Sequence, residues 1–344
     1  MKRIFRASKN NLFSQCAVII ILTALMLQPK TCAAASLKLT LSTENEIYGL
    51  SDTVVISGSL TFNNIPVADG LVGIEVMDPS NAHFTFRTAQ TGSITPTNCP
   101  VNFTQFYPSD SNGNPKYTFK KGSNLWIFYT AENHDSVSHQ VILPISIYNP
   151  DSIPIYATFQ SATTLEPGSS LTLLFLALPI STDLKVGTYK IYANAYSDFL
   201  KNFGYPYCPE QIATFTVTSS TSGSSMDLQE LSIQSFLING IYTSSFKLPK
   251  VGRIGTYTIY VGSRYQNQNA FSSMGFPVVL IGDINDDEMV EMMDFFLMSI
   301  SYNSRPGDPN WNEKCDIYPW PLGDDYIELM DFWLISLHYG DHAL

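Results

Sequence analysis

The chain has 344 residues, with 30 acidic and 19 basic side chains and a formal net charge of −11 at pH 7. Such a balance argues against a nucleic-acid partner, which needs a basic surface. Residues 282–344 hold 14 acidic residues and two basic ones, a net charge of −12, so the acidity belongs to the C-terminal part. The length is that of several domains.

The N-terminal segment has the three-part layout of a secretory signal peptide. Basic residues open the chain at Lys2, Arg3, Arg6 and Lys9. An apolar run over residues 16–27 and three alanines at 33–35 follow. We predict a signal peptide over residues 1–35, a mature chain that starts near Ser36, and a secreted, extracellular or cell-surface product. An uncleaved anchor is the alternative, but the run is shorter than the roughly 20 residues that cross a bilayer.

Three cysteines remain in the predicted mature chain: Cys99, Cys208 and Cys315. A secreted location permits disulfides. We predict a Cys99–Cys208 bridge, because both residues lie in loops next to prolines, and this leaves Cys315 as the odd thiol. Three cysteines allow three pairings, so the other two stay open.

Residues 37–280 carry the pattern of an all-β protein. Short alternating runs rich in Thr, Val, Ile, Tyr and Phe are separated by Gly, Pro, Asn and Asp. This spacing is typical of immunoglobulin-like sandwiches. About 245 residues exceed one ordinary sandwich of about 100, so we expect two.

An internal repeat indicates how these sandwiches are threaded. Residues 187–192 and 255–260 share the pattern Gly-Thr-Tyr-x-Ile-Tyr, which suits the penultimate strand of a sandwich. Residues 36–96 hold too few strands to close a sandwich, and residues 227–280 resemble the missing back half. We predict that residues 97–218 are a second sandwich inserted into the first, with 219–226 as linker. Three modules in series are the alternative, which leaves half-sandwiches with unpaired edges.

The β region shows no catalytic constellation, so we predict that the protein is not an enzyme. His134, Asp135 and His139 come closest to a metal cluster, but two histidines five residues apart on a loop define no ligand geometry, and we interpret them as a solvated turn. A glycoside hydrolase would need two carboxylates at a set separation in a cleft, and this region offers few acids.

Aromatic residues of the β region could contact sugars. Tyr205 and Tyr207 could form a stacking platform, because aromatic faces pack on apolar faces of a ring. Trp126 lies in an apolar strand, and we interpret it as the core tryptophan of a sandwich.

The C-terminal part contains two acidic segments, each followed by an apolar helical pattern. The first has oxygen donors at positions 1, 3, 5, 9 and 12 of a twelve-residue calcium loop, with a backbone carbonyl at position 7: Asp283, Asn285, Asp287, Glu291, Asp294 and Met289. The second is four residues longer and lacks the donor at position 3, but it matches at the others: Asp316, Asp324, Glu328, Asp331 and the carbonyl of Tyr326. Hard oxygen donors suit Ca²⁺ and not a transition metal.

The doubled loop and helix resembles a type I dockerin domain, with two EF-hand-like loops, on a secreted archaeal-type protein. The resemblance covers about residues 281–341 and implies a small α-helical module, residues 281–344, that folds around Ca²⁺. Glu288 stands where the family usually has glycine, at a position that needs a positive φ.

The resemblance also implies a partner, because dockerins bind cohesin modules. The family's contacts at loop positions 10 and 11 fall here on Met292, Met293, Leu329 and Met330. Packing of these side chains on the protein's own β region is the alternative, since exposed apolar patches are usually covered.

Two functions follow from these expectations. The first is a non-catalytic extracellular scaffold or adhesion protein, attached to a cohesin-like or other surface partner through a calcium-dependent tail. The alternative is a carbohydrate-binding or accessory subunit of a polysaccharide-degrading assembly, because dockerins commonly tether such proteins; polysaccharide is then a second partner.

Overall fold

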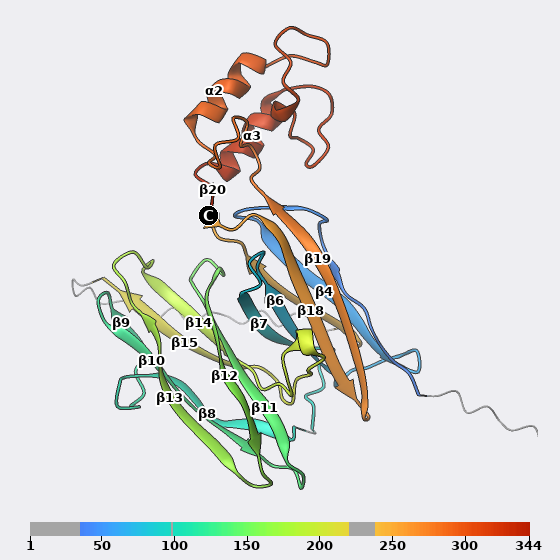
Figure 1. Cartoon of the computed structure of the whole chain (residues 1–344), viewed down its shortest axis with the longest axis vertical. Coiled ribbons are helices and arrows are strands. Elements are labelled where there is room, and N and C mark those ends of the chain that lie inside the picture. The colour runs from blue at the N-terminus through green and yellow to red at the C-terminus, as the bar shows by residue number, and fades with distance from the viewer. Residues whose placement is uncertain (1–34, 98, 220–237) are drawn as a thin grey trace, which may run out of the picture. The chain divides into compact units, whose positions relative to one another are not determined.

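The computed structural model describes residues 35–97, 99–219 and 238–344 (Figure 1). The predicted signal peptide up to residue 34 lies outside the described residues, as do residues 220–237, which include most of the predicted linker. Within the described residues the chain is mainly β, as the sequence predicts.

Two sheets are built from segments on either side of residues 99–219, and we call them the split β region. One contains β1 (Leu37–Leu39), β2 (Ser42–Thr43), β4 (Thr53–Phe62), β5 (Ile65–Pro66) and β16 (Ile241–Lys247). The other has the order β3 (Tyr48–Gly49), β19 (Gln268–Val279), β18 (Gly255–Tyr265), β6 (Leu71–Met77) and β7 (His83–Gln90). Distant segments pair directly: Ile56 lies opposite Ser244, and Ile74 opposite Val261.

The side-chain pattern of each strand explains its place in the split β region. Strand β4 alternates, and its buried residues join one core with Tyr48, Tyr257 and Phe276. Every residue of β6 is buried, which is typical of a strand covered on both faces.

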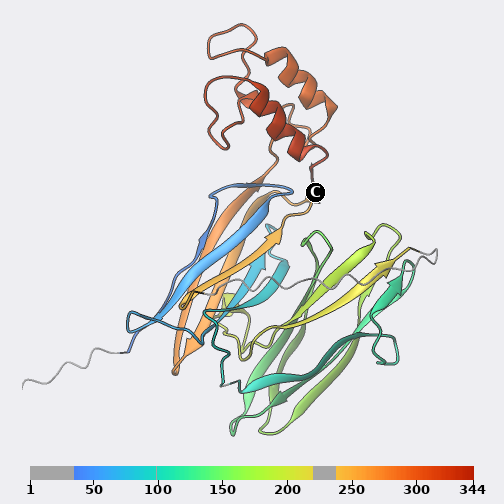
Figure 2. The same cartoon turned by 180° about the vertical axis from the view of Figure 1, so that it is seen from behind.

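Residues 99–219 form two further sheets, the central β region. One has the order β13 (Ser170–Pro179), β10 (Asn124–Asn133) and β8 (Val101–Ser109). The other has the order β12 (Pro154–Leu165), β11 (His139–Tyr148), β14 (Gly187–Ala193), β15 (Gln211–Thr218) and β9 (Thr118–Lys120). A separate core that includes Phe119, Tyr129 and Phe215 belongs to these sheets, which Figure 2 shows from behind.

The interpretation of Trp126 as a core residue is wrong. Strand β10 alternates strictly, and Leu125, Ile127 and Tyr129 face the core. Trp126 therefore points to the opposite face, where it is half-buried beside Leu176.

Strand β7 joins the two β regions, since it contacts β11, β12 and β14 as well as its own sheet. A small cluster at this junction consists of Phe86, Ile142, Tyr196 and Leu200, the last on the 3₁₀ helix η1 (Leu200–Asn202). The backbone N–H of Phe86 donates to the Ser146 hydroxyl at 2.8 Å, so polar contacts also cross the junction.

The C-terminal helical region, residues 281–344, contains α2 (Met292–Ser301), η2 (Glu313–Cys315) and α3 (Leu329–His338). Its own core includes Val290, Met298, Ile327 and Ile335. A short strand, β20 (His342–Ala343), pairs in parallel with β17 (Val251–Gly252) of the split β region. None of the helices in the described residues is long and apolar enough to span a membrane.

The predicted Cys99–Cys208 bridge is not formed. Cys99, Cys208 and Cys315 are all free in the structure. Cys208 is fully buried in the central core, and burial raises its pKa to about 12. The Cys99 thiol instead faces the carbonyl of Pro96 at 3.6 Å. Proline-flanked loops bring the two cysteines into one core, but this does not pair them.

Candidate functional site

The first acidic loop is organised by two of the predicted aspartates. The Asp283 carboxylate accepts from the backbone N–H groups of Asp287 at 3.2 Å and Glu288 at 3.1 Å. The buried Asp294 carboxylate accepts from Ile284 at 2.8 Å, Asn285 at 3.3 Å and Glu291 at 2.8 Å. The last of these bonds caps α2, so position 12 holds both ends of the loop on the helix.

The second loop repeats this arrangement despite its extra residues. Asp316 accepts from the backbone of Asp324 at 3.0 Å and Asp325 at 2.9 Å. Asp331 accepts from Ile317 and Tyr318, both at 2.8 Å, and from Glu328 at 2.7 Å. The insertion lies outside this frame, where Leu322 is 89% exposed. Position 3 of the second loop is Tyr318, which has no carboxylate or amide oxygen in its side chain.

Both loops turn through the left-handed region at position 6. Glu288 has φ of 68° and Asp325 has φ of 63°. This confirms the predicted positive φ at Glu288 and shows that Asp325, which the sequence analysis did not single out, has the same role in the second loop. A side chain in this region costs about 1–2 kcal/mol relative to glycine, so the hydrogen bonds to Asp283 and Asp316 hold a strained turn.

The two copies contact each other reciprocally. Val290, at position 8 of the first loop, exchanges backbone hydrogen bonds with Gly340 and Asp341, which follow α3. Ile327, at position 8 of the second, bonds in the same way to Asn303 and Ser304, which follow α2. Aromatic rings pack in the same reciprocal way: the ring centroids of Phe295 and Tyr339 lie 5.8 Å apart, and those of Phe332 and Tyr302 lie 5.7 Å apart. Each copy therefore completes the other.

Three carboxylates of the first loop, those of Asp283, Asp287 and Asp294, interact electrostatically. Burial raises the pKa of Asp283, and the carboxylates of Asp294 and Asp287 raise it further. Such repulsion is what a bound cation relieves. Within the described residues, no three His, Cys, Asp or Glu side chains stand in an arrangement that could hold a metal ion. The calcium sites at Asp283, Asn285, Asp287, Met289, Glu291 and Asp294, and at Asp316, Asp324, Tyr326, Glu328 and Asp331, thus stay a prediction.

The two helices carry matching exposed apolar stripes. On α2 these are Met292, Phe296 and Ile300, exposed by 69%, 57% and 54%. On α3 the equivalent residues are Leu329, Trp333 and Leu337, exposed by 70%, 49% and 52%. The spacing of four residues places each set on one helix face. Of the predicted partner residues, Met292, Met293 and Leu329 are exposed, and Met330 is half-buried beside a shallow hollow that Phe332 and Trp333 also line. Met292 and Leu329 are therefore largely uncovered by the rest of the chain that the structure describes.

The end of α3 is joined to the split β region by a buried polar cluster. The fully buried Asp341 accepts from the Ser51 hydroxyl at 2.7 Å and contacts His338 Nδ1 at 2.8 Å. His338 Nδ1 also lies 3.0 Å from the Leu50 carbonyl oxygen. The sequence gives no local signal for this cluster, because Ser51 and Asp341 lie 290 residues apart in the chain.

The candidate site residues of the central β region do not come together in one site. His139 Nε2 lies 2.9 Å from Asp135 Oδ2, whereas His134 lies 3.9 Å from Glu132, so the three do not converge. Tyr207 is only 5% exposed and donates to the Gln140 carbonyl, which leaves no free ring face for a sugar. Tyr205 is half-buried and keeps part of its ring accessible.

Comparisons with known proteins assign no family to this chain. No family model matches the sequence, and no curated protein matches it. Among solved structures, the C-terminal domain of wzt is similar at 14% identity and a TM-score of 0.30, over 40% of this chain and 81% of that one.

Two enzymes are also among the similar structures. The alkylpurine DNA glycosylase AlkC of Pseudomonas fluorescens has 11% identity and a TM-score of 0.26, over 37% of this chain and 32% of its own. A β-glucosidase of Listeria innocua has 12% identity and a TM-score of 0.24, over 34% and 16%. The chain spans only about a third of the glycosylase. At these scores none of the three carries an argument about this protein.

Proposed function

We propose that the protein is a non-catalytic extracellular scaffold or adhesion protein whose C-terminal helical region is a calcium-dependent docking module of the dockerin type. The observation that supports this proposal most is that both loops have the same hydrogen bonds. The carboxylate at position 1 accepts from the backbone N–H groups of positions 5 and 6, and the carboxylate at position 12 accepts from those of positions 2, 3 and 9. An unfolded acidic tail would not form the same set of hydrogen bonds twice.

The residues of the first loop fit a hard cation. Ca²⁺ takes six to eight oxygen ligands, and the loop offers Asp283, Asn285, Asp287, Glu291 and Asp294 with the carbonyl of Met289. A bound ion would neutralise carboxylates that now repel one another, and its binding energy would add to the folding energy of the module. The second loop offers one side-chain donor fewer, so we expect weaker binding there.

The exposed stripes supply the surface for a partner. Two equivalent apolar rows on a region this acidic suit a protein with an apolar groove and a basic rim, a cohesin-like or other surface protein. In this proposal the β regions are two immunoglobulin-like sandwiches, residues 36–96 plus 227–280 and residues 97–218, that act as a spacer. The two pairs of sheets with separate cores support that interpretation.

Hydrogen exchange of the intact protein tests the calcium step. With Ca²⁺ in place of a chelator, amides of residues 281–344 should exchange more slowly, while those of the two β cores serve as internal reference. Asp283→Asn should abolish the response of the first loop and leave that of the second. Amide exchange rates of residues 281–344 that are the same with and without Ca²⁺ would refute the proposal.

Pull-down with a set of immobilised cohesin modules tests the docking step. We expect retention in Ca²⁺ and release by chelator. A double change, Phe296→Asp with Trp333→Asp, should abolish retention because it charges both stripes. Leu322→Asp is the matched control, since that leucine is exposed but lies in the loop insertion. Retention that survives the double change would show that the stripes are not the docking surface.

A further inference from the structure

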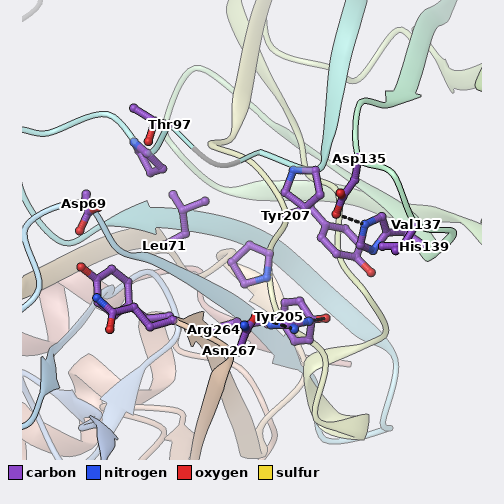
Figure 3. A pocket seen from close by; sticks show the side chains of 15 residues that line it. Asp69, Leu71, Thr97, Asp135, Val137, His139, Tyr205, Tyr207, Arg264 and Asn267 are labelled. Atoms are coloured by element: carbon purple, nitrogen blue, oxygen red, sulfur yellow. Dashed lines mark hydrogen bonds and ion pairs between the residues drawn. The ribbon is translucent and has the colours of Figure 1, made fainter. Parts of the chain in front are cut away.

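A cleft of about 580 Å³ lies where the two β regions meet (Figure 3), and none of its lining residues belongs to the helical region. The split β region contributes Asp69, Arg264 and Asn267, and the central β region contributes Asp135, His139 and Tyr205. Small-molecule sites typically measure about 300–1,000 Å³ and combine apolar walls with a few convergent polar groups. This cleft has both features, since Leu71, Val137 and three prolines are also among its lining residues.

The polar groups of the cleft are held in place before any ligand arrives. The Arg264 guanidinium lies over the Tyr205 ring, 4.9 Å from its centroid, and bonds to the Tyr205 hydroxyl. It also donates to the Asn267 side-chain oxygen at 3.2 Å. Asn267 sits in the tight turn between β18 and β19, where it and Gln266 have positive φ. Arg264 thus bridges the two β regions and still has N–H groups for a ligand.

The carboxylates lie on opposite sides of the cleft from each other in Figure 3. Asp135 is oriented by His139 Nε2 at 2.9 Å and by the backbone N–H of Ser136 at 2.7 Å. Asp69 is half-buried on the other side. A phosphate or other anion would meet two carboxylates, and a metal cation would meet the guanidinium. Neither an anionic nor a cationic ligand would therefore be attracted by all the charged groups of the lining.

We infer that this cleft binds a neutral polyhydroxylated ligand, a sugar residue, independently of the proposed calcium docking. A hydroxyl group both donates and accepts, so one ligand can donate to Asp69 and Asp135 and accept from Arg264 without burying a net charge. The C–H faces of a pyranose ring match the proline, leucine and valine walls and the accessible part of Tyr205. The site therefore differs from a Tyr205–Tyr207 platform, because Tyr207 is almost fully buried and supports the wall, whereas Tyr205 is half-buried.

Saturation-transfer NMR on the intact protein tests the inference. The probes are glucose, galactose, mannose, xylose and N-acetylglucosamine, with inorganic phosphate and glycine as charged competitors. At least one sugar should receive saturation, and neither phosphate nor glycine should displace it. Arg264→Ala and the nearly isosteric Asp69→Asn should each weaken binding at least about tenfold, because the first removes a hydrogen-bond donor to the ligand and the second replaces an acceptor oxygen of the carboxylate by an amide group that donates.

Arg253→Ala is the matched control, since Arg253 precedes the same strand but pairs with Asp78 at 3.4 Å, outside the cleft. It should leave sugar binding unchanged. Three results would each overturn the inference: no saturation of any sugar, displacement by phosphate or glycine, or binding that Arg264→Ala and Asp69→Asn leave intact. Asp69→Asn keeps the test meaningful if loss of Arg264 loosens the junction.

Discussion

Arg87 and Glu210 form a bidentate ion pair across the junction of the two β regions, with Nε–Oε1 and Nη2–Oε2 distances both 3.0 Å. The guanidinium also lies 3.7 Å from the centroid of the Tyr192 ring, and Glu210 accepts from the backbone of Thr88. Burial disfavours the charged guanidinium, but the Glu210 carboxylate outweighs it and raises the pKa of Arg87. Burial raises the pKa of Glu210 above its ordinary value, although the Arg87 guanidinium acts to lower it. The ion pair fixes the junction of the two β regions.

Removing one partner of this pair should destabilise the protein strongly. Glu210→Gln leaves a buried guanidinium without its counter-charge, and we expect a loss of about 3–5 kcal/mol in the free energy of unfolding. Urea unfolding followed by circular dichroism measures it. Asp151→Asn is the control, because the Lys185–Asp151 pair is exposed and should contribute less than about 1 kcal/mol. Equal losses from the two changes would contradict the structural role given to Arg87 and Glu210.

Relief of backbone strain should stabilise the loops. Glu288→Gly and Asp325→Gly each place glycine at a positive φ and should each raise the stability of the helical region by about 1 kcal/mol. Glu288→Ala removes the same charge but keeps a Cβ, so it separates strain from electrostatics. Thermal unfolding in chelator measures the change. Identical melting of the Gly and Ala variants would show that the turn carries no strain.

Loss of Asp341 should loosen the helical region from the split β region. Asp341→Ala leaves the Ser51 hydroxyl without its acceptor and removes one of the two oxygens that His338 Nδ1 contacts, at a cost of about 1–3 kcal/mol. Amides of β17 and β20 should then exchange faster with deuterium. Ser304→Ala changes the equivalent position of the first copy, whose hydroxyl donates to the Ser301 carbonyl of the same copy. If both variants accelerate exchange at β17, the contact is not specific to Asp341.

Alkaline pH should unfold the β regions through buried tyrosines. Burial raises the pKa of Tyr148 and of Tyr257 from the ordinary value of 10.0 to about 12. A raised folded pKa keeps the contribution of these groups to stability intact below pH 10 and removes it as the pH rises toward 12. Absorbance at 295 nm should therefore show a late phenolate fraction that appears together with unfolding, and Tyr257→Phe should reduce it. Ionisation of all tyrosines together near pH 10 in the folded protein would contradict this.

The spacing of residues along the chain predicts the local features of the acidic loops and of the strands. The spacing of Asp283 and Asp294 predicts the two carboxylates that organise the first loop, because a twelve-residue loop needs its donors at set intervals. Asp316 and Asp331 have the same roles in the longer second loop. The positive φ at Glu288 follows from the same frame. Alternating apolar residues identify the mainly β character, since successive side chains of a strand point to opposite faces.

Contacts between distant segments were decided only by the tertiary structure. Spacing could not tell which face of β10 would be buried, so Trp126 was misplaced, and proximity in one core did not pair Cys99 with Cys208. The Arg87–Glu210 pair, the Asp341–Ser51 contact and the cleft between Asp69 and Asp135 each join residues more than 60 positions apart. Such contacts depend on how whole sheets pack, and packing selects among many arrangements that satisfy the same local periodicity.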